Sequence, residues 1–262
     1  MLKRLIIIIF FLWNWVAYSQ IGLLKDFPFQ YGEEGEYDAI YQWGFIKIRA
    51  GTVIFRVDST YEDGISYYQF SSTGISKNKY DWIYSIRDTF MSKVRIYDFQ
   101  PIYYQRHTNE GDYSVYNETF FNEEQEMISM RLDNSKEGFR QKTLPYQKGM
   151  LDLQTAVYFA RLLNFENARI GDGFQFNIII DGEAFSIPIT YEGKETIELQ
   201  KNQPISCYKI STHVIEGTIF KSGQSIDIWV KDDGSQVPVK VEAPIIIGNI
   251  KAELIEVRIN KS

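Results

Sequence analysis

The side chains that could act as a nucleophile or a general base are few in this sequence. Cys207 is the only cysteine, and His107 and His213 are the only histidines. His107 lies in a polar segment that we expect to be a solvated loop, and His213 lies in a predicted strand, where a histidine is usually hydrogen-bonded within the sheet. No Gly-x-Ser-x-Gly motif, which would place a nucleophilic serine on a sharp turn, occurs. A hydrolase is therefore the least favoured function, and no catalytic residue is predicted.

Metal and cofactor motifs are also missing from the sequence. Cys207 sits in the alternating run 205–210, which is typical of a strand, so we expect a buried and unreactive thiol. Two isolated histidines without cysteine partners do not match the ligand spacing of a zinc site. Gly171 and Gly173 precede a predicted strand, whereas a phosphate cradle needs a glycine-rich loop that leads into a helix. The sequence thus predicts no metal and no cofactor.

Acidic residues gather in three short clusters. The members are Glu33, Glu34, Glu36 and Asp38, then Glu123, Glu124 and Glu126, then Asp232 and Asp233. Paired carboxylates support glycoside cleavage, and converging carboxylates bind calcium. Each cluster adjoins a predicted turn, however, where acidic side chains solvate the backbone, and the calcium-loop pattern is absent. We therefore interpret all three clusters as turn chemistry.

Alternation of apolar and polar residues dominates the chain from Glu36 onward. This period of two residues is the signature of strands with one buried face, and it predicts strands within 36–132 and within 174–259. Asp181-Gly182 separates two such runs and favours a two-residue hairpin turn with glycine at positive φ. Residues 136–148 are predicted to be a polar connection. About a dozen strands and one helix predict an all-β, or at least β-dominated, fold.

One segment, at about 152–163, shows the pattern of an α-helix. Asp152 can cap its N-terminus by accepting hydrogen bonds from free backbone N–H groups. Apolar residues repeat at helical spacing at Leu153, Ala156, Val157, Ala160 and Leu163. So short a helix is marginal in water, so we expect this stripe to pack against the concave face of the sheet. If the sheet holds a ligand, Tyr158 and Phe159 are the candidate ligand-binding residues.

The N-terminal segment has the features of an export signal. Two basic residues precede the apolar run 5–12, and Ala17 and Ser19 supply the small residues that are typical before a cleavage site. We therefore predict a signal peptide at residues 1–19 and one mature β-rich domain at 20–262. The apolar run is shorter than a bilayer-spanning helix, although a retained anchor is the alternative. No transmembrane span is predicted in the mature chain.

Composition limits the partners that this chain can bind. The net charge is −6 and the isoelectric point is near 5.2, while the basic residues are scattered singly, so binding to nucleic acid is disfavoured. A single cysteine cannot close an internal disulfide, so stability must come from burial. Phe, Tyr and Trp make up 16% of the chain, which favours strands. An aromatic surplus beyond the core could line a cavity or groove.

Several short motifs follow one another in an order that is informative only as a set. In chain order they are Gly35-Glu36, Tyr41-Gln42-Trp43-Gly44, Ala50-Gly51, Pro101, Asp152-Leu153-Gln154-Thr155-Ala156, Gly171-Asp172, Trp229-Val230-Lys231-Asp232-Asp233-Gly234, Pro238-Val239-Lys240-Val241 and Gly248-Asn249-Ile250-Lys251-Ala252-Glu253-Leu254. Over residues 34–258 the chain resembles the exported bacterial family of the domain of unknown function numbered 3108. The resemblance implies a curved antiparallel sheet or open barrel, similar to the half-barrels of periplasmic lipoprotein carriers, and it implies no reaction.

Two functions remain open from the sequence. The first is an exported protein, periplasmic or associated with the outer membrane, that binds or carries an apolar or lipid-like ligand such as an acyl chain. The alternative is an envelope scaffold or assembly factor that binds other proteins through sheet edges or loops. An aromatic-lined cavity with an open mouth would favour the carrier. A filled core with an exposed apolar edge would favour the scaffold.

Overall fold

Strands make up most of the protein. The computed structural model describes residues 21–199, 203–213, 225–245 and 248–260. The elements are β1 (Gly22–Leu23), β2 (Glu33–Trp43), β3 (Ile46–Glu62), β4 (Ile65–Ser76), the 3-10 helix η1 (Asn78–Tyr80), β5 (Ile86–Arg95), β6 (Pro101–Glu110), β7 (Tyr113–Asn122), β8 (Met127–Asn134), β9 (Arg140–Pro145), β10 (Met150–Asp152), α1 (Leu153–Ala160), β11 (Leu163–Asn164), β12 (Gly173–Ile180), β13 (Glu183–Glu198), β14 (Pro204–His213), β15 (Ser225–Lys231), β16 (Pro238–Pro244) and β17 (Asn249–Ile259). The predicted signal peptide, 1–19, lies outside the described residues.

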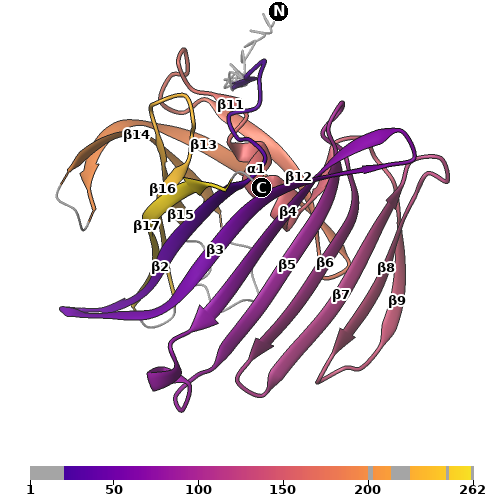
Figure 1. Ribbon diagram of the computed structural model, residues 1–262, viewed down its shortest axis with the longest axis horizontal. Helices are drawn as coiled ribbons and strands as arrows, with labels where there is room; N and C mark the ends of the chain where they lie inside the picture. Colours follow the sequence, from indigo (N-terminus) through magenta and orange to yellow (C-terminus); the bar gives the residue numbers. More distant parts are fainter. Residues whose placement is uncertain (1–20, 200–202, 214–224, 246–247, 261–262) are drawn as a thin grey trace, which may run out of the picture.

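One curved sheet contains fifteen of these strands (Figure 1). Its order is β10-β12-β13-β14-β15-β16-β17-β2-β3-β4-β5-β6-β7-β8-β9, and β1 pairs separately with β11. Neighbouring strands are antiparallel except for β10 and β12, which run parallel. Because β9 and β10 form the two edges, the sheet curls without closing. The prediction of a β-dominated fold with a curved antiparallel sheet and one main helix is confirmed.

The two ends of the sheet face each other across the interior. Met150 of β10 and Ile179 of β12 belong to the same buried cluster as Ile128, Met130 and Leu132 of β8. Burial of these apolar side chains contributes roughly 1.5–3 kcal/mol each, so the curl is maintained by a hydrophobic seam between strands that are not hydrogen-bonded to one another.

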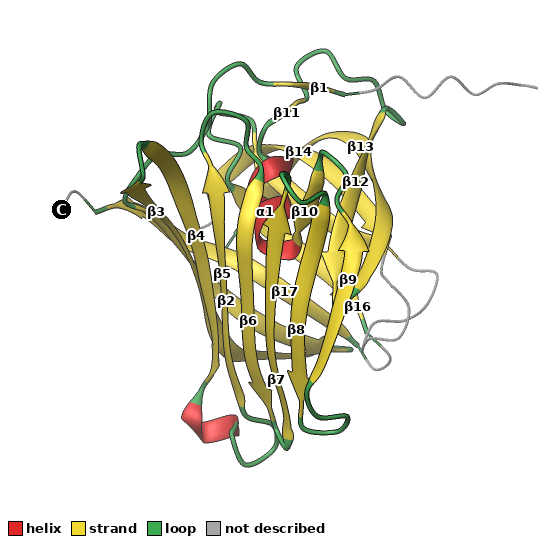
Figure 2. Ribbon diagram, turned by 90° about the vertical axis from the view of Figure 1, so that its right-hand side faces the viewer, coloured by secondary structure: helices red, strands yellow, loops and turns green. Residues whose placement is uncertain are grey.

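Helix α1 lies inside the curl (Figure 2), where it contacts β4, β5, β10 and β12. Asp152 caps it as predicted, because the backbone N–H of Thr155 donates to its carboxylate at 2.7 Å. The predicted packing of the helix on the concave face is confirmed, but the apolar stripe was only partly right: Ala156 and Leu163 are buried, whereas Leu153 is 39% exposed and Val157 is half-buried. The buried helix residues are Gln154, Thr155, Ala156 and Tyr158. Polar residues can be buried here because the facing strands supply hydrogen-bonding hydroxyl groups.

Arg161 fastens the end of this helix to three other parts of the chain. Its guanidinium, 4% exposed, pairs with Glu33 of β2 at 2.5 Å and donates to the carbonyl groups of Pro28 and Ser235 at 3.2 and 2.9 Å. Gln236 donates in turn to the Arg161 carbonyl. The helix therefore ends here, and the chain continues directly into β11.

Two further predictions about local structure were wrong. Residues 136–148 contain β9, an edge strand with mostly exposed side chains, so no apolar alternation marks it. His107 lies in β6 rather than in a loop, although its side chain is exposed as expected. Among the described residues, no helix is both long and apolar enough to cross a membrane.

The Asp181-Gly182 turn between β12 and β13 was predicted correctly. Both residues have positive φ, 48° and 87°, as a type I′ hairpin turn requires. The tip also touches the opposite end of the sheet: a Cβ on Gly182 would lie 2.8 Å from Cδ1 of Leu132 in β8. Two features therefore favour glycine at position 182: the positive φ of its backbone and the close approach of Leu132.

We predict that Gly182→Ala destabilises the protein more than Gly64→Ala. Gly64 has a similar φ of 82°, but a Cβ there would meet no atom within 4 Å. Both changes should cost about 1 kcal/mol for the left-handed conformation. Gly182→Ala should cost roughly 1–3 kcal/mol more, because it overpacks the contact with Leu132. Urea unfolding of both variants measures the difference, and equal losses would show that the hairpin tip does not pack on β8.

Candidate functional site

The candidate nucleophile Cys207 is buried within the sheet rather than available for catalysis. Cys207 is fully buried, its Sγ lies 3.6 Å from the carbonyl oxygen of Ile205, and burial raises its pKa to about 11. The thiol is thus protonated and shielded at neutral pH, as predicted. His213 is the last residue of β14, and exposed His107 has Tyr116 as an aromatic neighbour on β7, with ring centroids 5.8 Å apart.

The acidic cluster of β2 forms ion pairs rather than a metal site. Glu33 pairs with Arg161, and Glu34 pairs with Arg56 at 2.7 Å and with Arg258 at 2.9 Å. In the described part of the chain, no group of three or more His, Cys, Asp or Glu residues is arranged to hold a metal ion. Through these ion pairs the carboxylates link β2 to the neighbouring strands β3 and β17 and to the end of α1.

The candidate ligand residues Tyr158 and Phe159 both lie within the aromatic interior. The Tyr158 ring, 3% exposed, stacks on Phe70 of β4 with centroids 3.9 Å apart, and its hydroxyl donates to the Arg56 carbonyl at 3.1 Å. Phe159 is half-buried and lies 5.5–5.8 Å from three other phenylalanine rings: Phe99, Phe174 and Phe176. Both rings thus attach α1 to the sheet by aromatic packing, which leaves a ligand role for them as a prediction.

A polar cluster lies beside these rings at the start of α1. The buried carboxylate of Asp152 accepts from the Ser92 hydroxyl at 2.5 Å and from the Thr155 hydroxyl at 2.7 Å. Ser72 donates to Gln154 at 2.8 Å. Burial raises the pKa of Asp152 to about 6, although the hydrogen bonds from Ser92 and Thr155 oppose that rise.

The β12–β13 tip forms a polar latch on the opposite wall. The Asp181 carboxylate accepts from Arg106 of β6 at 3.0 Å with both oxygens and from Asn117 of β7 at 2.8 Å. A hollow of about 150 Å³ lies next to this latch, with Lys136 and Arg140 among its lining residues. Ligand pockets usually measure about 300–1,000 Å³, so this polar hollow does not suit an acyl chain.

Five of the most exposed large apolar side chains lie at one end of the sheet. The connections β2–β3, β4–β5 and β8–β9 share this end because neighbouring strands alternate in direction, and it is the lower end in Figure 1. Trp43 and Phe45 are 58% and 99% exposed in the first connection, Trp82 and Ile83 are 82% and 64% exposed in the second, and Phe139 is 63% exposed in the third. We call these five residues the apolar rim.

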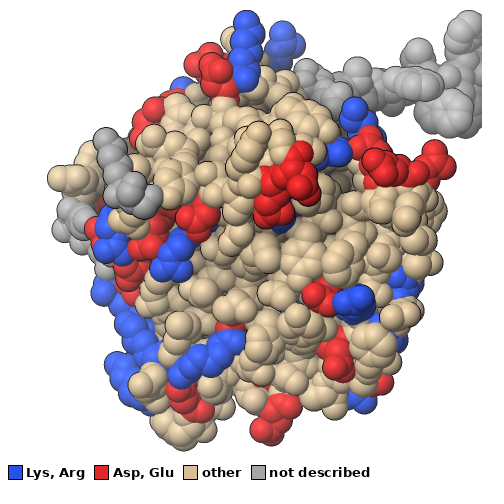
Figure 3. Space-filling model, turned by 45° about the vertical axis from the view of Figure 1, so that its right-hand side comes forward, with Lys and Arg blue, Asp and Glu red and all other residues tan. Residues whose placement is uncertain are grey.

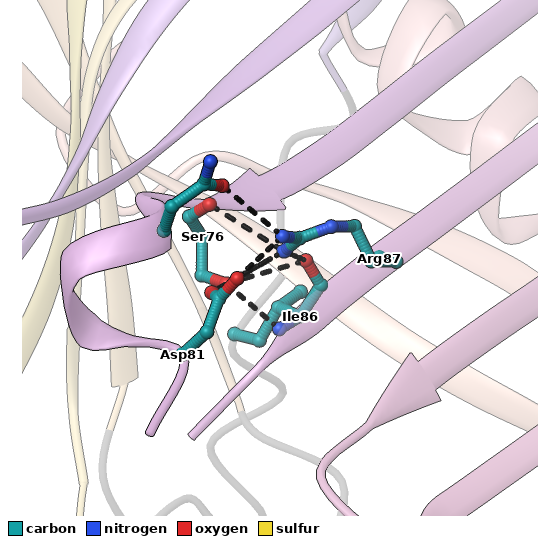
Figure 4. Close-up of polar contacts among 5 residues, drawn as sticks. Ser76, Asp81, Ile86 and Arg87 are labelled. Carbon is teal, nitrogen blue, oxygen red and sulfur yellow. Dashed lines mark hydrogen bonds and ion pairs between the residues drawn. The ribbon is translucent and has the colours of Figure 1, made fainter. Parts of the chain in front are cut away.

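The connection that carries Trp82 and Ile83 is held by a compact polar network (Figure 4). Arg87 reaches Asp81 at 2.5 Å and Ser76 at 2.8 Å, and the Ile86 N–H donates to the Ser76 hydroxyl at 2.9 Å. Hydrogen bonds from Arg87 and Ser76 hold the pKa of Asp81 below its usual value, so this carboxylate stays ionised at neutral pH. The exposed position of Trp82 and Ile83 therefore follows from an ordered loop.

Basic side chains accompany the rim. Lys77 and Lys79 flank η1, and Lys136 precedes Phe139; none of the three forms an ion pair with a residue that the structure describes. The lower margin of the face in Figure 3 carries Lys and Arg side chains, mostly toward the left, with Asp and Glu side chains among them. Acidic side chains lie at both ends of the sheet: Glu110 and Asp112 stand at the β6–β7 connection beside the rim, and the turn at 123–126, at the opposite end, carries three glutamates.

Comparison with known proteins identifies the family. The sequence model of a family described as "Protein of unknown function (DUF3108)" matches residues 36–255. The chain belongs to this family. The DUF3108 resemblance predicted from the ordered motifs is thereby confirmed. No curated protein matches the sequence.

A solved structure shares the fold of this DUF3108 protein. It is the crystal structure of a β-barrel-like protein of the domain of unknown function DUF1849 from Brucella abortus, and it aligns with a TM-score of 0.56 at 7% identity. The match covers 94% of this chain and 100% of that chain. At such low identity the likeness shows the fold alone.

Sequence reasoning missed the rim and the latch for different reasons. The sequence did contain a signal for the rim. Trp43 and Phe45 flank Gly44, where the strand alternation breaks, and residues 82–84 are apolar without a clear period. The latch joins Arg106 to Asp181 across 75 positions, and no local pattern reports such a contact.

We predict that Asp152 makes the stability of the protein depend on pH. Its folded-state pKa of about 6 exceeds the ordinary 3.8, so its stabilising effect is present below pH 3.8 and is lost as the pH rises through 6. Between these values the stability of the wild type relative to Asp152→Asn should fall by roughly 3 kcal/mol. Chemical unfolding of both proteins across this pH range measures it.

The Asp152→Asn comparison is needed because burial also raises the pKa of Asp88 to about 6, so both groups titrate together in the wild type. Asp88→Asn is the matched control, and it should retain the Asp152-dependent slope. A constant difference between wild type and Asp152→Asn across the range would contradict the prediction.

Proposed function

We propose that this protein is an exported, non-enzymatic binding module of the cell envelope that contacts an apolar partner through its apolar rim. One observation carries the proposal: five large apolar side chains are exposed on three connections at one end of the sheet, while aromatic side chains around α1 pack against one another inside it. Monomeric proteins seldom expose such side chains in a group unless they form an interaction site.

The packed aromatic rings around α1 support a surface site over an enclosed one. Phe29, Phe70, Phe99 and Tyr158 belong to one buried cluster around α1, and their rings contact one another directly. An acyl chain placed there would have to displace these rings. The outer rim needs no such rearrangement to meet a partner.

Export is supported by the N-terminal sequence, with its basic start, short apolar run and small residues before Gln20. That signal, together with the family resemblance, supports a location in the periplasm or at the outer membrane. Cys207 is buried and the β2 carboxylates form ion pairs, and both observations support binding rather than hydrolysis.

A carrier for an apolar ligand is the second candidate, and the latch favours it. Polar contacts from Asp181 and the apolar seam of Met150 and Ile179 with β8 join the two ends of the sheet, and their separation would open the interior that holds Phe159. In that case Tyr158 and Phe159 border the ligand. Native mass spectrometry of protein purified from its own envelope fraction would then show a bound lipid.

We expect the rim to be required for association with envelope membranes. The rim variant combines Trp43→Ser, Phe45→Ser, Trp82→Ser and Ile83→Ser. Wild-type protein should co-sediment with envelope membranes of the source cell, whereas the variant should stay in the supernatant, because each removed side chain loses roughly 1.5–3 kcal/mol of burial.

The matched control combines Tyr61→Ser and Tyr97→Ser, two aromatic residues at the opposite end that are 73% and 71% exposed. This control should bind like the wild type, and both variants should melt near the wild-type temperature because the changed side chains are exposed. Equal sedimentation of the rim variant and the wild type would overturn the proposed function.

A further inference from the structure

We propose that the partner of the apolar rim is the surface of a phospholipid bilayer that carries anionic headgroups. This inference rests on the proposed function and names the partner class for the same site. It depends on the shape of the rim, on its hydrogen bonding and on its charge.

The shape of the rim suits a continuous soft surface. Its five residues stand on three separate connections, and the Phe45 ring is 99% exposed at the tip of a hairpin. Separate projecting tips at one end of a sheet can enter one plane together. A folded protein partner would need a matching pocket for each tip, whereas a bilayer interface accepts them without one.

The chemistry of the rim suits the interfacial layer of a bilayer. Tryptophan is enriched at this depth, where a ring can be partly buried among headgroups and acyl chains. The indole N–H of Trp82 already donates to the Lys79 carbonyl at 3.0 Å. Insertion of this ring therefore leaves no indole donor without a partner, which removes the main polar cost of burial.

The charge of the connection that carries Trp82 favours anionic headgroups. Lys77, Lys79 and Lys136 project near it without an ion pair among the described residues. Glu110 and Asp112 of the β6–β7 connection lie at the same end and oppose this attraction, so the lysines act locally, at the tips that bear Trp82 and Phe139. A lysine close to such a surface contributes about 1 kcal/mol of attraction.

The network of Ser76, Asp81 and Arg87 strengthens this interpretation. It fixes the connection that bears Trp82 before any contact is made, so binding costs little ordering of that loop. The same network also neutralises Asp81, the acidic residue next to Trp82.

The test measures vesicle binding with tryptophan as the reporter. The chain that begins at Gln20 contains every described strand and helix, and its only tryptophans are Trp43, Trp82 and Trp229. Vesicles of phosphatidylcholine alone are compared with vesicles of phosphatidylcholine and phosphatidylglycerol in equal amounts, each also made with brominated acyl chains that quench nearby indoles.

We expect binding to the anionic vesicles and quenching of Trp43 and Trp82 in the Trp229→Phe variant. The variant with Trp43→Phe and Trp82→Phe should bind but show no quenching, because Trp229 is 6% exposed. Each serine substitution in the rim should weaken binding about tenfold. Each of Lys77→Gln and Lys79→Gln should weaken it about fivefold, and added salt should do the same.

Three results would overturn the inference. Equal, salt-independent binding to both vesicle types would remove the role of anionic headgroups. Binding without quenching of Trp43 or Trp82, or binding that the Tyr61→Ser and Tyr97→Ser control abolishes, would place the contact elsewhere. Absence of vesicle binding together with rim-dependent sedimentation on envelope membranes would assign the rim to a protein partner, and the proposed function would still stand.

Discussion

The buried ion pair between Arg161 and Glu33 is the contact on which the arrangement of this protein depends. A helix of eight residues is not stable alone in water, so α1 forms only because the surrounding strands hold it. Arg161 supplies that hold at the helix end, since it joins β2, the segment at Pro28 and the turn at Ser235. Removing one partner of such a pair would leave a charge buried without compensation, which typically costs about 3–5 kcal/mol.

Helix α1 in turn determines how the concave face of the sheet is used. Its polar side meets hydroxyl groups at Ser72 and Ser92, and its aromatic side meets Phe70 and Phe99. Both contacts are made by side chains of the protein itself, so the concave face is used for internal packing. The part of the concave face next to α1 is therefore covered by the helix itself.

Local sequence patterns were sufficient for the strands and turns but not for the helix face or the edge strand. Alternation identifies a strand wherever one face is buried and the other is wet, and Asp181-Gly182 identifies its turn because few dipeptides tolerate two positive φ values. The buried face of α1 could not be predicted from the spacing of apolar residues. Burial of the capping residue Asp152 and of Gln154 depends on hydroxyl groups 60 and 82 positions away, which periodicity does not report. Strand β9 was not predicted because both of its faces are largely exposed, so its sequence shows no alternation.

The candidate site was harder to predict because composition counts aromatic residues without saying which face they occupy. The sequence suggested a surplus that could line a cavity, yet the described interior uses its rings for packing, and the exposed aromatic side chains stand at turns. A turn is where strand alternation stops, so the period that separates inside from outside no longer applies to Trp43, Phe45 or Trp82. Large apolar residues placed in turns gain nothing from the core, and their exposure costs solubility. Such positions are therefore better indicators of a binding surface than aromatic content alone.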